Sequence, residues 1–185
     1  MKKTTLCIAA LLCAIAAHAQ NASSSAVQQI RCQLNDVVGV GMAGGNGGGN
    51  GGGGSSVEMP LNGTTAMGSG IESPEFKVNL FSNANFDVSV QASSNAFTYT
   101  GTATSGTNMP VKDVLSVIIT DNNTGGDVTN GYNNYQSVNG TAGKRVIGNG
   151  QIGTSSFGFK YKANPGFNYP AGTYTTDILY TITKH

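Results

Sequence analysis

The sequence predicts an all-β fold, specifically an antiparallel immunoglobulin-like β-sandwich, with a closed β-barrel as the alternative. Apolar and polar residues alternate with period two in many short segments, which is typical of strands with one buried face. Clusters of Asn, Gly, Ser and Thr separate these segments, as turns would. Beyond the N-terminal leader, no window of eleven or more residues shows a helical period. A net charge of +1 supplies none of the self-repulsion found in disordered chains.

Residues 1–19 are predicted to be a signal peptide. Lys2 and Lys3 precede an apolar run over residues 6–17, and Ala17-His18-Ala19 has the pattern of a cleavage site before Gln20. The apolar run is shorter than the roughly twenty residues that a membrane span requires. We therefore expect cleavage and export, to the periplasm, the cell surface or the medium, with no transmembrane segment in the processed chain.

Three regions are expected to follow the leader. Residues 20–43 form a β-like arm, with alternating residues over 27–34 and a second short run over 37–40. Residues 44–54 are nine Gly and two Asn, and are predicted to be a flexible linker. A phosphate-binding loop would need a Lys and a Ser or Thr opening a helix, which this run lacks. Residues 55–185 are assigned to the sandwich domain.

The arm is expected to be an edge strand that pairs either with its own domain or with a neighbouring copy. Closing a loop through a long linker costs little more than closing a shorter one, so the linker favours intramolecular pairing only weakly. An unpaired edge left by a departing arm would be a template for another strand.

Within the domain, each alternating segment is predicted to be a strand with one apolar face. The clearest segments are 76–80, 86–90, 97–99, 157–161 and 174–182. Residues 114–120 are more continuously apolar, which predicts a central strand covered on both faces. The expected core comprises Val78, Leu80, Phe86, Val88, Val90, Val117, Ile119, Phe157, Phe159, Tyr161, Ile178, Tyr180 and Ile182.

The last strand is introduced by the most specific local pattern of the chain. In the segment 167–174, Pro170 suits the first central position of a tight turn, and Gly172 allows the chain to leave that turn. This Pro-Ala-Gly-x-Tyr entry into a terminal alternating strand resembles the last strand of bacterial secreted immunoglobulin-like proteins, including fimbrial subunits and spore coat protein U-like pilins. The resemblance covers residues 154–183, with weaker similarity over 76–90. It implies a surface or appendage protein, although fimbrial subunits usually carry a disulfide that this chain cannot form.

Cys32 is the one cysteine that remains after leader cleavage, so no intramolecular disulfide is possible. It alternates with Ile30 and Leu34, which predicts burial on the inner face of a strand. Intermolecular pairing or a reactive thiol is the alternative. A nucleophilic role would need a basic neighbour, and the only His outside the leader is the final residue, His185.

The sequence predicts no enzyme, no cofactor and no metal site. It contains no G-x-S-x-G motif, and its nine acidic residues are scattered, which disfavours a carboxylate pair for glycoside hydrolysis. The loop 121–127 begins like a calcium-binding loop, but Tyr132 stands at the twelfth position, where an acid is needed, so we predict a plain turn. Lys and Arg are too few and too dispersed for a nucleic-acid partner.

Four aromatic residues in Asn-rich, loop-like sequence are candidate ligand-binding residues: Tyr132, Tyr135, Phe167 and Tyr169. Aromatic faces beside amides suit a glycan, because rings cover the apolar side of a sugar while amides bind its hydroxyls. The same residues could instead cap one end of the core. We thus expect an exported structural or adhesive surface protein, a fimbria-like subunit whose partner is another copy or another surface protein. A monomeric carbohydrate-binding module is the alternative.

Overall fold

The computed structural model describes residues 23–34 and 56–185, apart from residue 130. The predicted signal peptide, residues 1–19, and the predicted linker, residues 44–54, lie outside the described residues. Of the predicted arm, residues 20–43, the described part is the strand β1, Ser23–Leu34.

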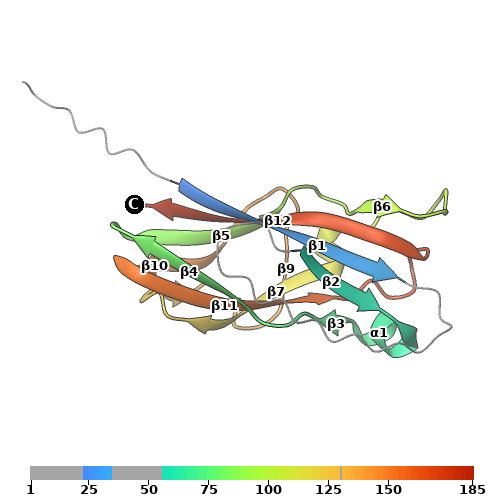
Figure 1. Cartoon of the computed structure of the whole chain (residues 1–185), viewed down its shortest axis with the longest axis horizontal. Coiled ribbons are helices and arrows are strands. Elements are labelled where there is room, and N and C mark those ends of the chain that lie inside the picture. The colour runs from blue at the N-terminus through green and yellow to red at the C-terminus, as the bar shows by residue number, and fades with distance from the viewer. Residues whose placement is uncertain (1–22, 35–55, 130) are drawn as a thin grey trace, which may run out of the picture.

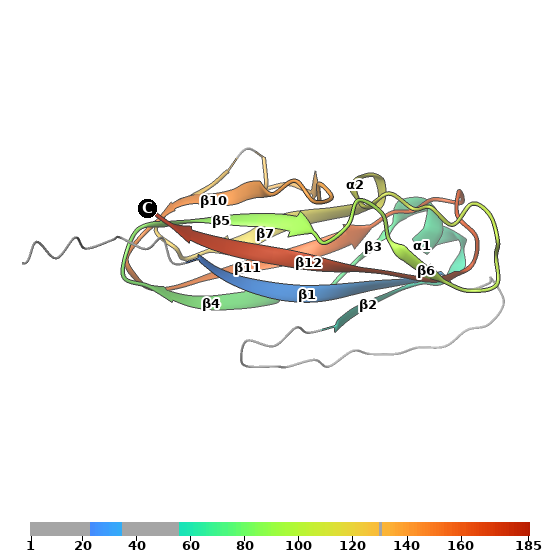
Figure 2. The same cartoon turned by 90° about the horizontal axis from the view of Figure 1, so that it is seen from above.

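The described residues fold into two curled β-sheets that face each other (Figures 1 and 2), which confirms the all-β prediction. The larger sheet has the order β2-β1-β12-β5-β10-β8, with β6 also pairing β12. Its remaining strands are β2 (Ser56–Leu61), β5 (Phe86–Ala92), β6 (Thr98–Thr100), β8 (Asp127–Val128), β10 (Lys144–Gly150) and β12 (Gly172–Lys184).

The smaller sheet has the order β3-β11-β7-β9, with β4 also pairing β11. Its strands are β3 (Ile71–Glu72), β4 (Phe76–Ser82), β7 (Leu115–Asn122), β9 (Gln136–Ser137) and β11 (Gly153–Ala163). Two short helices, α1 (Gly63–Ser69) and α2 (Val111–Val114), lie in the connections. The strands divide into two separate sheets, so the fold is a sandwich and not the barrel that was the alternative.

The core between the sheets matches the alternation of the sequence. All predicted core residues are buried except Val78 and Ile182, which are half-buried and pack against the core. Phe159 lies at its centre, with ring centroids 5.7 Å from Phe76, 5.3 Å from Tyr161 and 4.8 Å from Tyr180. Because Phe159 lies on β11 and Tyr180 on β12, this aromatic cluster joins the two sheets.

The expectation for residues 114–120 was wrong in one respect. In β7, buried residues alternate with half-buried or exposed ones over residues 115–120, so only one face of the strand is fully covered. Ile118 is half-buried on the outer face. Because Ile118 is apolar, the sequence predicted burial on both faces of the segment, although the face that carries Ile118 is partly open to solvent.

The prediction that the arm is an edge strand was wrong for the second half of β1. β1 pairs antiparallel with β12 over its whole length, and residues 29–34 also pair parallel with β2, so this half lies inside the larger sheet while residues 23–28 have β12 as a neighbour on one side. The edge is β2, which contains Pro60. Pro lacks an N–H and is tolerated in edge strands, where one side of the backbone has no neighbour.

Side-chain hydrogen bonds hold the two segments that the sequence predicted to be turns. In the loop before β8, the Asn122 side chain donates to the Gly126 carbonyl at 2.8 Å and its oxygen accepts from the Thr124 hydroxyl at 2.6 Å, as in a side-chain-closed turn. Before β12, the Tyr174 hydroxyl donates to the Pro170 carbonyl at 3.0 Å. A Cβ at Gly172 would lie 2.3 Å from the Tyr99 ring, so only glycine fits there.

Candidate functional site

The candidate site is the groove between β2 and β12 that β1 fills, hereafter the β1 groove. β1 pairs with β12 over its whole length, from Ser23 opposite Thr183 to Leu34 opposite Gly172. Over its second half it also pairs with β2, with Gln29 opposite Ser56. Figures 1 and 2 both show β1 lying along β12 with β2 on its other side.

The covalent connection between β1 and the rest of the fold is much longer than its place in the sheet requires. Because β1 and β2 are parallel, the chain must return from the level of Leu34 to that of Gln29, about 17 Å at about 3.3 Å per residue. Residues 35–55, fully extended, could span about 70 Å. This length would allow β1 to reach a groove on a neighbouring copy as well as its own.

The inward face of β1 completes the core. Ile30 and Cys32 are fully buried, and Gln28 is 7% exposed. Burial raises the pKa of the Cys32 thiol from 9.0 to about 12, so the thiol is protonated at neutral pH. This supports the prediction that Cys32 is a small core residue, and a thiol kept from solvent in this way is unreactive while β1 is in place.

Gln28, on the inward face of β1, makes a polar contact with the opposite sheet. The Tyr161 hydroxyl, on β11 in the opposite sheet, donates to the Gln28 Oε1 atom at 2.8 Å. Burial, followed by the neighbouring phenol of Tyr180, raises the pKa of Tyr161 well above its usual value. The Tyr161 hydroxyl therefore stays protonated, and Gln28 is the acceptor that β1 supplies to it.

The outward residues of β1 are polar except Val27, which is itself 50% exposed. Arg31 lies opposite Glu58 of β2, with 3.5 Å between their charged groups, and the two side chains are 42% and 67% exposed. An exposed ion pair of this kind contributes about 0–1 kcal/mol. The groove therefore holds β1 mainly through its backbone hydrogen bonds and its buried face.

The four predicted ligand-binding aromatics lie in different surroundings. Tyr132 is 6% exposed and belongs to the core, so its ring is not offered to a ligand. Tyr135 is half-buried, with the Lys162 ammonium 5.8 Å from its ring centre. Phe167 is 63% exposed, and Tyr169 packs edge-on against Tyr174 at 6.4 Å.

Tyr135 is the one of these four aromatics that lines a described pocket. The pocket measures about 270 Å³, and its polar lining includes Ser116, Ser137, Lys162 and Asn164. Burial, followed by a hydrogen bond and the negative charge of Glu72, raises the pKa of Tyr135 to about 12.

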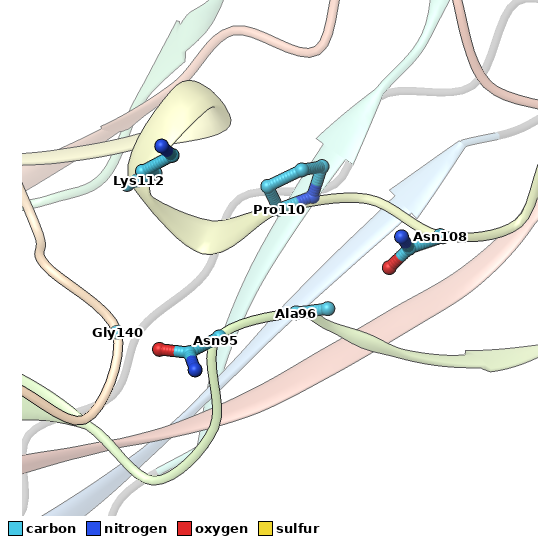
Figure 3. A pocket seen from close by; sticks show the side chains of 6 residues that line it. All are labelled: Asn95, Ala96, Asn108, Pro110, Lys112 and Gly140. Atoms are coloured by element: carbon cyan, nitrogen blue, oxygen red, sulfur yellow. The ribbon is translucent and has the colours of Figure 1, made fainter.

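A second pocket, of about 360 Å³, adjoins the first at Lys112, which lines both. Figure 3 shows its lining, with Asn95 and Ala96 on one segment and Asn108, Pro110 and Lys112 on another. The Asn95 side-chain oxygen already accepts a hydrogen bond from the Thr141 N–H at 3.2 Å, so part of its hydrogen-bonding capacity is used within the protein. This pocket has no aromatic lining, and the sequence analysis did not identify it.

Within residues 23–34 and 56–185, no helix is long and apolar enough to span a bilayer. The described part of the chain also holds no group of three or more His, Cys, Asp or Glu side chains placed to bind a metal ion.

No protein-family model matches the chain, and no curated protein matches it. A solved structure of a Burkholderia pseudomallei antigen and type I fimbria protein is similar to it at 11% sequence identity, with a TM-score of 0.44. The match covers 88% of this chain and 99% of that one.

Sequence reasoning missed the pairing of Gln28 with Tyr161. One signal was present, because Gln28 has the same strand parity as Ile30 and Cys32 and therefore faces inward. The partner could not be found this way, since Tyr161 lies far along the sequence and on the other sheet.

Proposed function

We propose that this chain is an exported, non-enzymatic structural protein of the cell surface whose copies join by exchanging β1. The observation that carries the proposal is the position of β1: inside the larger sheet, yet joined to the rest of the fold only through residues 35–55. A strand held in this way can leave its own sheet and enter another. Its departure would also leave β2 without a strand beside it, because β1 is the one strand that pairs with β2 in the described part of the chain.

Exchange between copies would conserve the contacts of the groove. The same pairs with β12 and β2, and the same burial of Ile30 and Cys32, form whether β1 comes from its own chain or from a neighbour. Without β1, the edge of β12 would be unpaired, β2 would have no strand beside it among the described strands, and part of the core would be exposed. A filled groove is therefore strongly favoured, while the identity of the donor chain is only weakly specified.

Two kinds of assembly follow from exchange of β1. Two copies that exchange strands with each other would form a closed dimer, whereas a copy that donates to one neighbour and accepts from another makes head-to-tail contacts, which do not pair identical surfaces. Contacts of this type build open chains unless a rotation closes them into a ring. A fimbria-like subunit with a structural or adhesive role is the form of this proposal that the resemblance of the last strand implies.

A cross-linking experiment tests exchange directly. Val27 and Leu179 face each other across β1 and β12, so Val27→Cys with Leu179→Cys, in a Cys32→Ala background, places two thiols across the groove. At high protein concentration, we expect oxidation to give a ladder of covalent oligomers on a non-reducing gel.

Oxidation in dilute solution, before assembly, should lock β1 in its own chain and abolish the ladder. Val27→Cys with Phe81→Cys is the matched control, because Phe81 is 76% exposed on β4 of the other sheet and should give no ladder. Cross-links that stay within one chain at every concentration would refute exchange.

Export has its own test. The protein is expressed from its full sequence, and the intact mass of the folded product should begin at Gln20. A folded product that retains Met1 would contradict the export part of the proposal.

A monomeric carbohydrate-binding module is the second candidate. The observation that favours it is the pocket beside Tyr135, where an aromatic ring lies among hydroxyl, amide and ammonium groups. Tyr135→Ala should then abolish retention on a glycan column, whereas Phe81→Ala, which removes an exposed aromatic elsewhere, should not. This candidate also requires that the protein stay monomeric at all concentrations.

A further inference from the structure

We propose that the Gln28–Tyr161 hydrogen bond sets the register of the strand that fills the β1 groove, so that the groove selects a strand with the inward pattern Gln-x-Ile-x-Cys. The selectivity for a partner rests on the proposed function. The register within one chain does not. The partner inferred is β1 of a second copy.

Apolar burial alone does not determine where β1 sits. A slip of one residue would turn its apolar face to solvent, but a slip of two keeps the same face inward. Two-residue slips bring Ala26 or Ile30 to the place of Gln28, opposite the Tyr161 hydroxyl. Neither side chain can accept a hydrogen bond, so in both slipped registers the Tyr161 hydroxyl loses its contact with β1 and keeps only the neighbouring Tyr180 phenol.

The slipped registers also misplace the amide. One slip moves Gln28 toward the position of Ile30, which is fully buried, and the other moves it toward that of Ala26, which is exposed. At the Ile30 position the amide would lie opposite Thr176, whose buried hydroxyl has no hydrogen-bond partner among the described residues, but the Tyr161 hydroxyl would lose its contact with Gln28. At the Ala26 position the exposed amide would no longer contribute to the core. The native register is the one that satisfies the amide and the phenol together.

Tyr161 is held firmly enough to act as a fixed reference point. Its N–H donates to the Ser73 hydroxyl at 2.9 Å, and its carbonyl accepts from the Ser73 N–H, also at 2.9 Å. Its ring packs against Phe159 at 5.3 Å and Phe76 at 6.3 Å. The hydroxyl therefore has one position, and the incoming strand must adjust to it.

The ion pair between Arg31 and Glu58 determines the register of β1 less strongly. Arg31 and Glu58 also face each other only in the native register, but both side chains are largely exposed and salt would screen their attraction. High salt should therefore leave the register of β1 unchanged, whereas a substitution of Gln28 should shift it.

The test measures register by cross-linking in a Cys32→Ala background. Val27→Cys is combined with Leu179→Cys, which is opposite in the native register, or with Asp177→Cys or Thr181→Cys, which would be opposite after a two-residue slip. With Gln28 present, we expect the 179 pair to form almost exclusively.

The key substitution is Gln28→Met, which keeps the length of the side chain but removes the acceptor. We expect the ratio of slipped to native cross-links to rise about 10- to 100-fold, as loss of one buried hydrogen-bond partner implies (about 1.4 to 2.8 kcal/mol). Gln29→Met, a change at the adjacent outward-facing residue, is the matched control and should leave the ratio unchanged.

If Gln28→Met does not fold, Gln28→Met with Tyr161→Phe keeps the test decisive, because neither buried group is then left unsatisfied. This double variant should regain stability and still slip. An unchanged cross-link ratio in the Gln28→Met or the double variant would overturn the register proposal.

The same gels separate this proposal from strand exchange. The position of the cross-link reports the register, whereas a ladder reports exchange between chains. A ladder whose register ignores Gln28 would leave exchange standing and refute the role of Gln28. Register control without a ladder would support that role while refuting exchange.

Discussion

Substituting Ile30 should loosen β1 from its groove by an amount that can be worked out from the structure. Ile30 is fully buried and lies between Thr176 of β12 and Val57 of β2. Replacing a buried Ile by Ala typically costs 2–5 kcal/mol, and we take about 3 kcal/mol for Ile30→Ala. Since about 1.4 kcal/mol is a factor of ten, the population with β1 detached should rise about 100-fold.

The thiol of Cys32 reports this population. Cys32 lies two residues from Ile30 on the same face of β1, is fully buried, and has a pKa raised to about 12 by that burial. A thiol reagent can modify it only when β1 opens, so the labelling rate tracks the open population when closing is faster than labelling. Ile30→Ala should therefore be labelled about 100-fold faster than the wild-type protein.

Val27→Ala is the matched control on the same strand. Val27 is 50% exposed, so its substitution should change stability by less than about 0.5 kcal/mol and the labelling rate by less than about threefold. Wild-type labelling as fast as that of the unfolded chain would refute the reasoning, because β1 would then not occupy the groove. Equal rates for Ile30→Ala and Val27→Ala would also refute it.

Three further predictions concern stability, each measured by denaturant unfolding. The difference in the free energy of unfolding between the wild-type protein and Cys32→Ala should be constant with pH up to about 9 and fall as pH rises toward 12, because the folded state holds the Cys32 proton to about pH 12 and the unfolded state releases it near 9; groups common to both proteins, such as Tyr135 with its raised pKa, cancel in this difference, and a difference that does not change with pH would contradict this origin. Phe159→Ala should cost about 3–5 kcal/mol and Phe81→Ala less than about 0.5, because the first ring is 3% and the second 76% exposed; similar losses would contradict this placement. Gly126→Ala should cost about 1–3 kcal/mol or more, because its Cβ would meet the backbone at 2.2 Å, whereas Gly68→Ala, with 3.8 Å to its nearest neighbour, should cost nothing; a neutral Gly126→Ala would show that this loop can move.

The sequence by itself determined the fold class, most strand positions and most of the core. Period-two alternation is a local property, since successive side chains of a strand point to opposite faces. It therefore identified the inward residues of β5, such as Phe86 and Val88, and it predicted a buried Cys32. Where alternation was weak, as in β7, the prediction was wrong about the second face.

Strand neighbours, in contrast, were decided only by the tertiary structure. Whether β1 lies at an edge or inside a sheet depends on β2 and β12, and β12 is at the opposite end of the sequence. The hydrogen bond between Gln28 and Tyr161 likewise joins two sheets. The burial of Tyr132 in the core, three residues from the partly exposed Tyr135, was also decided by the tertiary structure. Alternation says which face a residue occupies, but the partner opposite that face is fixed by long-range pairing, which a local pattern does not encode.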